Sequence, residues 1–251
     1  MTANSHPRAT NPPRHGVARV VSKMGLGSRT QAAQWVREGR VRVNGKVVHD
    51  AEFPVRQGLD RIDIDGQVSA SAQRIVLMLN KPRGLVTTVK DEQDRDTVYR
   101  CLSGADLPWL APVGRLDKAS EGLLLFTNDP VWAAGITGPE AGQSKTYHVQ
   151  IDRLPDAALL AALESGVALE GERLAARSAR CLRVGNRNAW LEISLDEGRN
   201  RQIRRLLSAL EVSVLRLVRV AIGELQLGAL PKGQWRKLTG PEIASLTSRA
   251  R

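Results

Sequence analysis

GRLDKASEGLLLFTNDP, residues 114–130, is the stretch that decides the fold. Its apolar run from Leu123 to Phe126 predicts a buried strand. Asp117 comes just before this run, in a turn where a carboxylate is held at the edge of a rigid core and can face a cleft. By itself, however, an aspartate before a strand is typical of a turn or a cap. A catalytic role for Asp117 therefore needs a second element.

That second element is GRNRQIRRLL, residues 198–207. A helix through it has one apolar and one basic face, formed by Ile203, Leu206, Leu207 and Leu210 and by Arg201, Arg204, Arg205 and Ser208. A solvated charge stripe is one interpretation. Crowded like charges at helical spacing are locally unfavourable, so the pattern favours an anionic partner.

Further elements surround these two motifs. They are strand candidates at Ile75 to Leu79, stopped by Asn80-Lys81-Pro82, at Thr146 to Ile151 and at Trp190 to Leu195, and a helix at Arg201 to Leu210. Because the order has no regular βαβ rhythm, it predicts an α+β domain on a mostly antiparallel sheet. We expect this domain at residues 74–245, after a polar linker at residues 67–73.

A smaller unit is expected at residues 16–66, behind a polar, proline-containing tail at residues 1–15 that we expect to be flexible. Ser28 followed by Gln31 predicts a capping box, and Gly39 predicts the end of that helix. VRVNGKVV, which follows at once, predicts a β-hairpin with a type I′ turn at its Asn-Gly pair.

The chain is strongly basic, with 37 lysines and arginines against 26 acidic residues and a formal net charge of +11. Such a charge draws a polyanion by counterion release, and RNA, DNA and an acidic membrane surface all fit charge alone. Arg29 stands in the first turn of the predicted helix, where a cation opposes the helix dipole. It fits a docked anion there, or simply a solvated arginine.

Features that the chain lacks exclude metal-binding, membrane-spanning and secreted proteins. Cys101 and Cys181 are far apart, and the four histidines are scattered, so no metal site is expected. No apolar run reaches about 18 residues, and no signal peptide opens the chain. We therefore expect a soluble protein of the reducing cytoplasm without a membrane partner.

Two resemblances rest on these motifs. The capped helix, glycine stop and NG hairpin resemble the S4 RNA-binding domain over about residues 17–65. The later motifs resemble the small-subunit-type group of ribosomal RNA pseudouridine synthases that carry an S4 domain. These motifs are LNKPRG at 79–84, GRLDKASEGLLLFTND at 114–129, KTYHV at 145–149 and EGRNRQIRRL at 197–206. Pro130 departs from the family's usual glycine, and Ser120 replaces its usual threonine.

The resemblance implies an isomerisation, in which the C1′–N1 bond of a uridine breaks and a C1′–C5 bond forms. Such a reaction needs no cofactor. Asp117 would be the catalytic carboxylate, as nucleophile at C1′ or base at C2′, with Arg204 as its basic partner and Tyr147 against the flipped uracil. We expect further RNA contacts from Arg115, Lys81, Arg199, Arg201, Arg205, Arg29, Arg40 and Arg42.

The expected partner is ribosomal RNA or a pre-ribosomal particle, bound by a monomer. We prefer 23S over 16S RNA because EGRNRQIRRL and the closing LPKGQWRKLT look closer to family members that act there. One alternative is a non-catalytic S4-type ribosome-assembly factor, which would not need the three catalytic candidates. The other is a glycosidase or nuclease with paired carboxylates, which would need a second acid such as Glu121, a residue that we expect to point to solvent.

Overall fold

The chain is described by a computed structural model that covers residues 13–57, 59–68, 73–89, 91–138 and 143–247. It divides into two compact units, residues 1–74 with 108–110 and residues 75–107 with 111–251. Residues 1–12 of the predicted tail and residues 69–72 of the predicted linker lie outside the described part. The flexibility expected for both segments stays a prediction.

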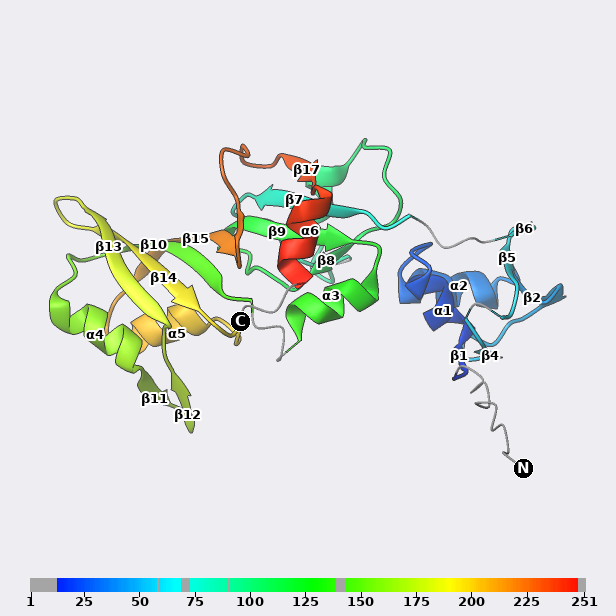
Figure 1. Cartoon of the computed structure of the whole chain (residues 1–251), viewed down its shortest axis with the longest axis horizontal. Coiled ribbons are helices and arrows are strands. Elements are labelled where there is room, and N and C mark those ends of the chain that lie inside the picture. Colours follow the sequence, from blue (N-terminus) through cyan, green and yellow to red (C-terminus); the bar gives the residue numbers. More distant parts are fainter. Residues whose placement is uncertain (1–12, 58, 69–72, 90, 139–142, 248–251) are drawn as a thin grey trace, which may run out of the picture. The chain divides into compact units, whose positions relative to one another are not determined.

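The first unit consists of a helix pair and two small antiparallel sheets (Figure 1). Its elements are β1 (His15–Gly16), α1 (Val17–Lys23), α2 (Arg29–Arg37), β2 (Val41–Val43), β3 (Lys46–Val47), β4 (Pro54–Val55), β5 (Ile62–Ile64) and β6 (Gln67–Val68). The sheet order is β3-β2-β5-β6, and β1 pairs with β4. Helix α1 was not predicted. Two segments that were predicted to lie outside the folded unit form strands in these sheets: His15 of the predicted tail and Gln67–Val68 of the predicted linker.

The local signals of this unit act as predicted. The Ser28 side chain accepts a hydrogen bond from the Gln31 backbone, and the Gln31 side chain accepts one from the Ser28 backbone, which is the capping box. Gly39 ends the helix at φ +72°. Asn44 and Gly45 have φ values of 51° and 82°, as a type I′ hairpin turn requires.

The second unit is built on a large sheet. Its strands are β7 (Val76–Lys81), β8 (Ala111–Val113), β9 (Glu121–Thr127), β10 (Lys145–Ile151), β13 (Ser178–Val184), β14 (Ala189–Leu195), β15 (Val214–Ile222), β16 (Leu225–Gln226) and β17 (Trp235–Lys237). In the described residues the order is β13-β14-β10-β15-β9-β7-β17, with β16 beside β15 and β8 beside β9. Among the named strands of the described residues, only β15 and β9 pair in parallel, so the predicted mostly antiparallel α+β fold is confirmed.

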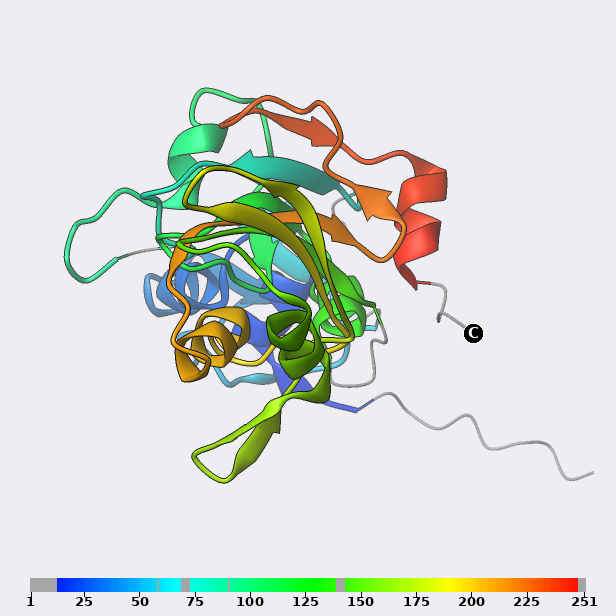
Figure 2. The same cartoon turned by 90° about the vertical axis from the view of Figure 1, so that its left-hand side faces the viewer.

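Helices cover two regions of this sheet. The helices are η1 (Val98–Leu102), α3 (Pro130–Thr137), α4 (Ala157–Ser165), α5 (Gln202–Ala209) and α6 (Gly240–Thr247). A hairpin of β11 (Val167–Leu169) and β12 (Glu172–Leu174) follows α4. Helices α4 and α5 pack against the half formed by β10, β13, β14 and β15 (Figure 2). Within the described part of the chain, none of the helices is long and apolar enough to cross a membrane.

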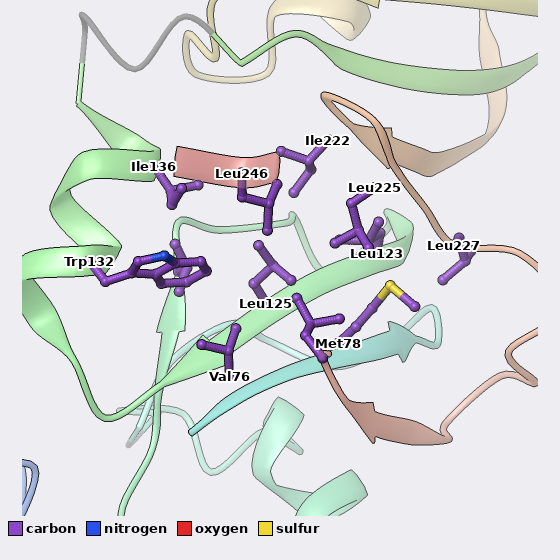
Figure 3. Close-up of a cluster of buried hydrophobic side chains, with 12 residues drawn as sticks. Val76, Met78, Leu123, Leu125, Trp132, Ile136, Ile222, Leu225, Leu227 and Leu246 are labelled. Carbon is purple, nitrogen blue, oxygen red and sulfur yellow. The ribbon is translucent and has the colours of Figure 1, made fainter. Parts of the chain in front are cut away.

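The other half of the sheet holds a large apolar core. Figure 3 shows Met78 of β7 and Leu125 of β9 in one cluster with Trp132 of α3 and Leu246 of α6. All four side chains are buried. Burial of this size stabilises the strands of the decisive stretch by roughly 1.5–3 kcal/mol for each large apolar side chain. The turn that carries Asp117 is therefore attached directly to a strand of this buried core.

Gly122 makes the parallel junction between β9 and β15 possible. It has φ +100°, and a Cβ atom at this position would overlap the carbonyl oxygen of Arg219. Only glycine allows the two backbones to come so close. The contact places Arg219 of β15 directly beside the strand that follows Asp117.

Candidate active site

A cavity of about 510 Å³ lies on one face of β14, β10 and β15. Its floor includes Lys145 and Tyr147 of β10, which share a face because side chains alternate along a strand. Tyr147 stands opposite Arg219 of β15, which also lines the cavity. The walls come from the turn at residues 113–117, the end of α3, the loop at residues 196–199 and the start of α5. Sequence motifs that are far apart in the chain thus meet at one site.

Asp117 stands at the wall of this cavity. About a third of its side chain is exposed, at 34%, so the carboxylate can be reached from the cavity. Arg201 Nη1 lies 3.3 Å from Asp117 Oδ2, and the two side chains form an ion pair. This hydrogen bond fixes the orientation of the carboxylate.

Hydrogen bonds to the backbone hold the turn around Asp117 in place, because each carbonyl from residue 116 to residue 120 accepts one. The donors in order are the Thr87 hydroxyl, Lys81 Nζ with the Ser120 amide, the Gly84 amide, Arg204 Nη2, and Lys81 Nζ again. Lys81 and Gly84 both belong to the LNKPRG motif. This motif therefore positions the carboxylate by fixing the backbone that carries it.

Lys81 was predicted to bind the RNA substrate, but its side chain is fully buried, at 0% exposure. Its Nζ donates to the carbonyl oxygens of Pro82, Asp117 and Ser120 at 3.2, 3.1 and 2.8 Å. Burial lowers the pKa of Lys81 to about 8, against the opposing effects of Asp117, Cys101 and Glu121. The ammonium group is a positioning element and is not open to RNA.

Arg204 was predicted to be the basic partner of Asp117, but the ion pair with this carboxylate is formed by Arg201. The Arg204 guanidinium donates to the carbonyls of Ala119 and Val214, at 3.2 and 3.4 Å, and burial lowers its pKa. Arg201 reaches Asp117 because it precedes α5 in a left-handed conformation, with φ 48° and ψ 32°. Non-glycine residues rarely adopt this conformation, and such strain is concentrated at functional sites.

Glu121 was predicted to point to solvent, but it is only 2% exposed. It forms ion pairs with Arg216 and Lys232. Burial by itself would raise the pKa of Glu121, but the hydrogen bonds from these two cations outweigh it and lower the pKa. Glu121 does not line the cavity, so it does not form a catalytic carboxylate pair with Asp117 there.

The other predicted RNA-contacting residues fall into two groups. Arg115 is exposed and lines the cavity. Arg42 is exposed, with one long contact to the Gly45 carbonyl at 3.4 Å. The remaining four are already held by acidic side chains: Arg29 by Glu52, Arg40 by Asp65 and Glu38, Arg199 by Glu172 and Glu197, and Arg205 by Glu170 and Glu172. A phosphate would have to compete with these carboxylates.

Sequence reasoning did not single out Arg219 or Lys145 as site residues, although both lie on the cavity floor. Burial lowers the pKa of Lys145, and the nearby Arg219 guanidinium lowers it further. One signal for Arg219 was present in the chain: a single arginine in the apolar run LVRVAI, residues 217–222. A charge in the middle of a buried strand is costly unless it has a partner.

We expect Arg201→Ala to lower the single-turnover rate about 10- to 100-fold, because a well-placed hydrogen bond to the carboxylate is lost. The matched control is Arg205→Ala on the same helix, whose guanidinium is held by Glu170 and Glu172 away from Asp117. This control should keep its turnover rate at saturating RNA. Equal losses in both variants would show that Arg201 acts on general RNA binding instead of on the carboxylate.

Comparison with known proteins identifies the family of the chain. Residues 75–209 match the family model described as RNA pseudouridylate synthase, and residues 17–60 match the S4 domain. The chain is 33% identical to the ribosomal large subunit pseudouridine synthase B of Bacillus subtilis (strain 168), over 92% of this chain and 95% of that protein. It is 37% identical to the protein of the same name from Escherichia coli (strain K12), over 88% of this chain and 78% of that protein.

A solved structure described as a pseudouridylate synthase is also similar, with a TM-score of 0.63 and 31% identity, over 93% of this chain and 99% of that chain. The match extends over both compact units. Both motif-based resemblances are confirmed by these findings. The chain belongs to the RNA pseudouridylate synthase family and carries an S4 domain in front of the synthase domain.

Proposed function

We propose that this protein converts specific uridines of ribosomal RNA to pseudouridine, and that its target lies in the large-subunit RNA. The observation that carries the proposal is the ion-paired Asp117 carboxylate, fixed by its backbone at a cavity that also contains Tyr147. The names of the two relatives, both large subunit synthases, favour 23S over 16S RNA. All of these groups come from one chain, so a single copy is sufficient.

In the proposed reaction, Asp117 acts on the ribose of a uridine that has been flipped into the cavity. Two routes use this carboxylate: attack of Oδ on C1′, or removal of the C2′ proton to give a glycal. In the first route the C1′–N1 bond breaks as Oδ bonds to C1′, the base turns, and C5 then displaces Oδ from C1′. In the second route N1 leaves as the C2′ proton is removed, and a proton returns to C2′ when C5 of the turned base bonds to C1′ of the glycal. The C5 proton is lost and N1 gains one, so atoms and electrons balance without a redox partner.

Tyr147 is placed to support the base during this turn. Its side chain is 9% exposed and lies on the cavity floor, where an aromatic ring can stack on a uracil. Arg115 is exposed at the rim, and we propose that it holds the RNA region that the uridine leaves. The basic side of α5 would bind the flanking phosphates, because grooves of about 360 and 410 Å³ beside it are both lined by Arg201, Arg204 and Ser208.

The S4 unit would add affinity through exposed cations. Arg37, Arg42 and Lys46 are exposed and form no ion pair with another described residue. Replacing all three by alanine should reduce the slope of log K against log salt by roughly 2.1–2.7, at roughly 0.7–0.9 for each phosphate contact. Turnover at saturating RNA should not change.

Arg40→Ala is the matched control for that measurement. Its guanidinium binds both carboxylate oxygens of Asp65, at 2.9 and 2.6 Å, and lies over the Trp35 ring. It is therefore not free for a phosphate, and the salt slope should stay as in the unchanged protein. A triple variant with the full slope would remove this surface from the RNA interface.

The proposed function is tested by mapping pseudouridine in both ribosomal RNAs from cells with and without the gene. We expect at least one large-subunit site to revert to uridine and to regain pseudouridine when the gene is returned. Loss of a small-subunit site instead would correct the choice of RNA. Identical maps would contradict the enzyme assignment on ribosomal RNA.

A further inference from the structure

Arg219 is a buried cation that the reaction described above does not use. Its side chain is 7% exposed and lines the cavity beside Tyr147. Its Nε donates to the Leu123 carbonyl at 2.8 Å, whereas Nη2 is buried without a hydrogen-bond partner in the described part of the chain. An unpaired buried donor on a charged group is costly, and native structures rarely keep one without a function.

A second cation lies next to it. Lys145 is half-buried, lines the same cavity, and is close enough for the two positive charges to interact. Asp196 partly offsets this repulsion, but its carboxylate is bound to Arg177 at 3.0 Å. The floor beside Tyr147 thus offers hydrogen-bond donors, and it holds positive charge that the surrounding residues do not neutralise.

A purely structural role does not explain Arg219. The one hydrogen bond that ties it to β9 uses Nε alone. The rest of the guanidinium remains buried at the cavity, where it must repel Lys145. A ligand with acceptor atoms would satisfy the free donor and relieve the repulsion together. The ligand chemistry that fits is a flat ring edge with carbonyl oxygens, since the cavity already presents a tyrosine ring.

We propose that Arg219 and Lys145 bind the carbonyl edge of the flipped uracil and so make the site specific for uracil over cytosine. This inference rests on the proposed function and names the residues that select its base. Uracil has oxygens at C2 and C4, whereas cytosine has an amino group at C4. Two cationic donors can meet the C4 oxygen, but they would face the N–H donors of a cytosine amino group. A site built around donors rejects such a mispaired base strongly.

The same two cations would also assist the chemical step. When the C1′–N1 bond breaks, its electron pair stays with the base, which becomes a uracil anion with charge on both carbonyl oxygens. Arg219 and Lys145 lie on the cavity floor where that charge develops, and the burial of Arg219 strengthens its interaction with the charge. The charge disappears when C5 bonds to C1′, the C5 proton leaves and N1 is protonated. The cations therefore stabilise the separated base more than the bound uridine.

The test uses the full chain and two RNA fragments that carry either uridine or cytidine at the mapped target position. Binding is measured with Asp117→Asn and with Asp117→Asn/Arg219→Met, so that no turnover occurs. The Asp117→Asn protein should bind the uridine fragment about 10- to 100-fold more tightly, and the double variant should bind the two within about threefold. Single-turnover rates with Asp117 intact should fall at least about 100-fold in Arg219→Met and partly recover in Arg219→Lys.

Arg183→Met is the matched control, because this arginine of β13 is exposed and does not line the cavity. It should keep both the base preference and the rate. A folded Arg219→Met protein with an unchanged rate and preference would overturn the inference while leaving the proposed function standing. Absence of turnover by the unchanged protein on the uridine fragment would instead count against the proposed function. Lys145→Met, measured in the same way, keeps the test decisive if Arg219→Met does not fold.

Discussion

Asp117→Asn is expected to abolish pseudouridine formation, with a single-turnover rate at least about 1,000-fold lower. The amide has the same shape but can neither attack C1′ nor accept the C2′ proton, and general-base catalysis alone contributes about 10²–10⁴. RNA affinity should remain within about threefold, because the phosphate contacts lie elsewhere. The rate is measured as tritium released from C5-labelled uridine in ribosomal RNA.

Asp196→Asn is the matched control for this variant. Asp196 also lines the cavity, but its carboxylate is bound to Arg177. It should retain most of the rate. Tritium release at the normal rate from Asp117→Asn would remove this carboxylate from the mechanism. With the unchanged protein, a deuterium isotope effect at C2′ would favour the glycal route, and its absence would favour attack at C1′.

Lys81→Met is expected to lower the rate through the backbone of the turn that carries Asp117. The variant removes the ammonium group that ties the carbonyls of Pro82, Asp117 and Ser120 together. Because a catalytic group misplaced by about 1 Å can cost about 100-fold in rate, we expect a loss of that size. Some stability should be lost as well, because the carbonyls of Pro82, Asp117 and Ser120 lose a donor, so the rate is compared for folded protein. Lys118→Met, an exposed lysine of the same turn, is the control.

Because the pKa of Lys81 is lowered to about 8, we expect turnover to depend on pH. Above this pH the amine is neutral and has two N–H donors for three carbonyls, so turnover should fall. Between about pH 8 and the ordinary lysine pKa near 10.4, the unfolded chain binds the proton that the folded chain has lost. The contribution of Lys81 to stability therefore rises with pH in this window. Turnover should fall without unfolding, and a rate independent of pH up to 9.5 would contradict the role of Lys81.

Local sequence patterns predicted much of the fold. The capping box at Ser28, the glycine stop at Gly39 and the Asn44-Gly45 turn all act within a few residues, so each could be recognised without tertiary information. The buried run Leu123 to Phe126 lies within β9. Helix α1 has no such terminal signals, since its N-cap Gly16 makes no side-chain hydrogen bond, and it was missed.

The site was only partly predictable because its geometry depends on contacts between distant residues. Whether Arg201 or Arg204 meets Asp117 is decided by the left-handed backbone at Arg201, which sequence spacing does not reveal. Lys81 is buried because three carbonyls from two segments converge on it. Glu121 is buried because Arg216 and Lys232, about a hundred residues further along the chain, neutralise it. Motif order identified the family, whereas these individual roles needed the structure.

One measurement tests the central claim most directly: tritium release from C5-labelled ribosomal RNA of cells that lack the gene, incubated with the purified full chain. We expect release from large-subunit RNA, accompanied by new pseudouridine at the site that the mapping identifies, and none with Asp117→Asn. Failure of the folded, unchanged protein to release tritium from the RNA of either subunit would contradict the account.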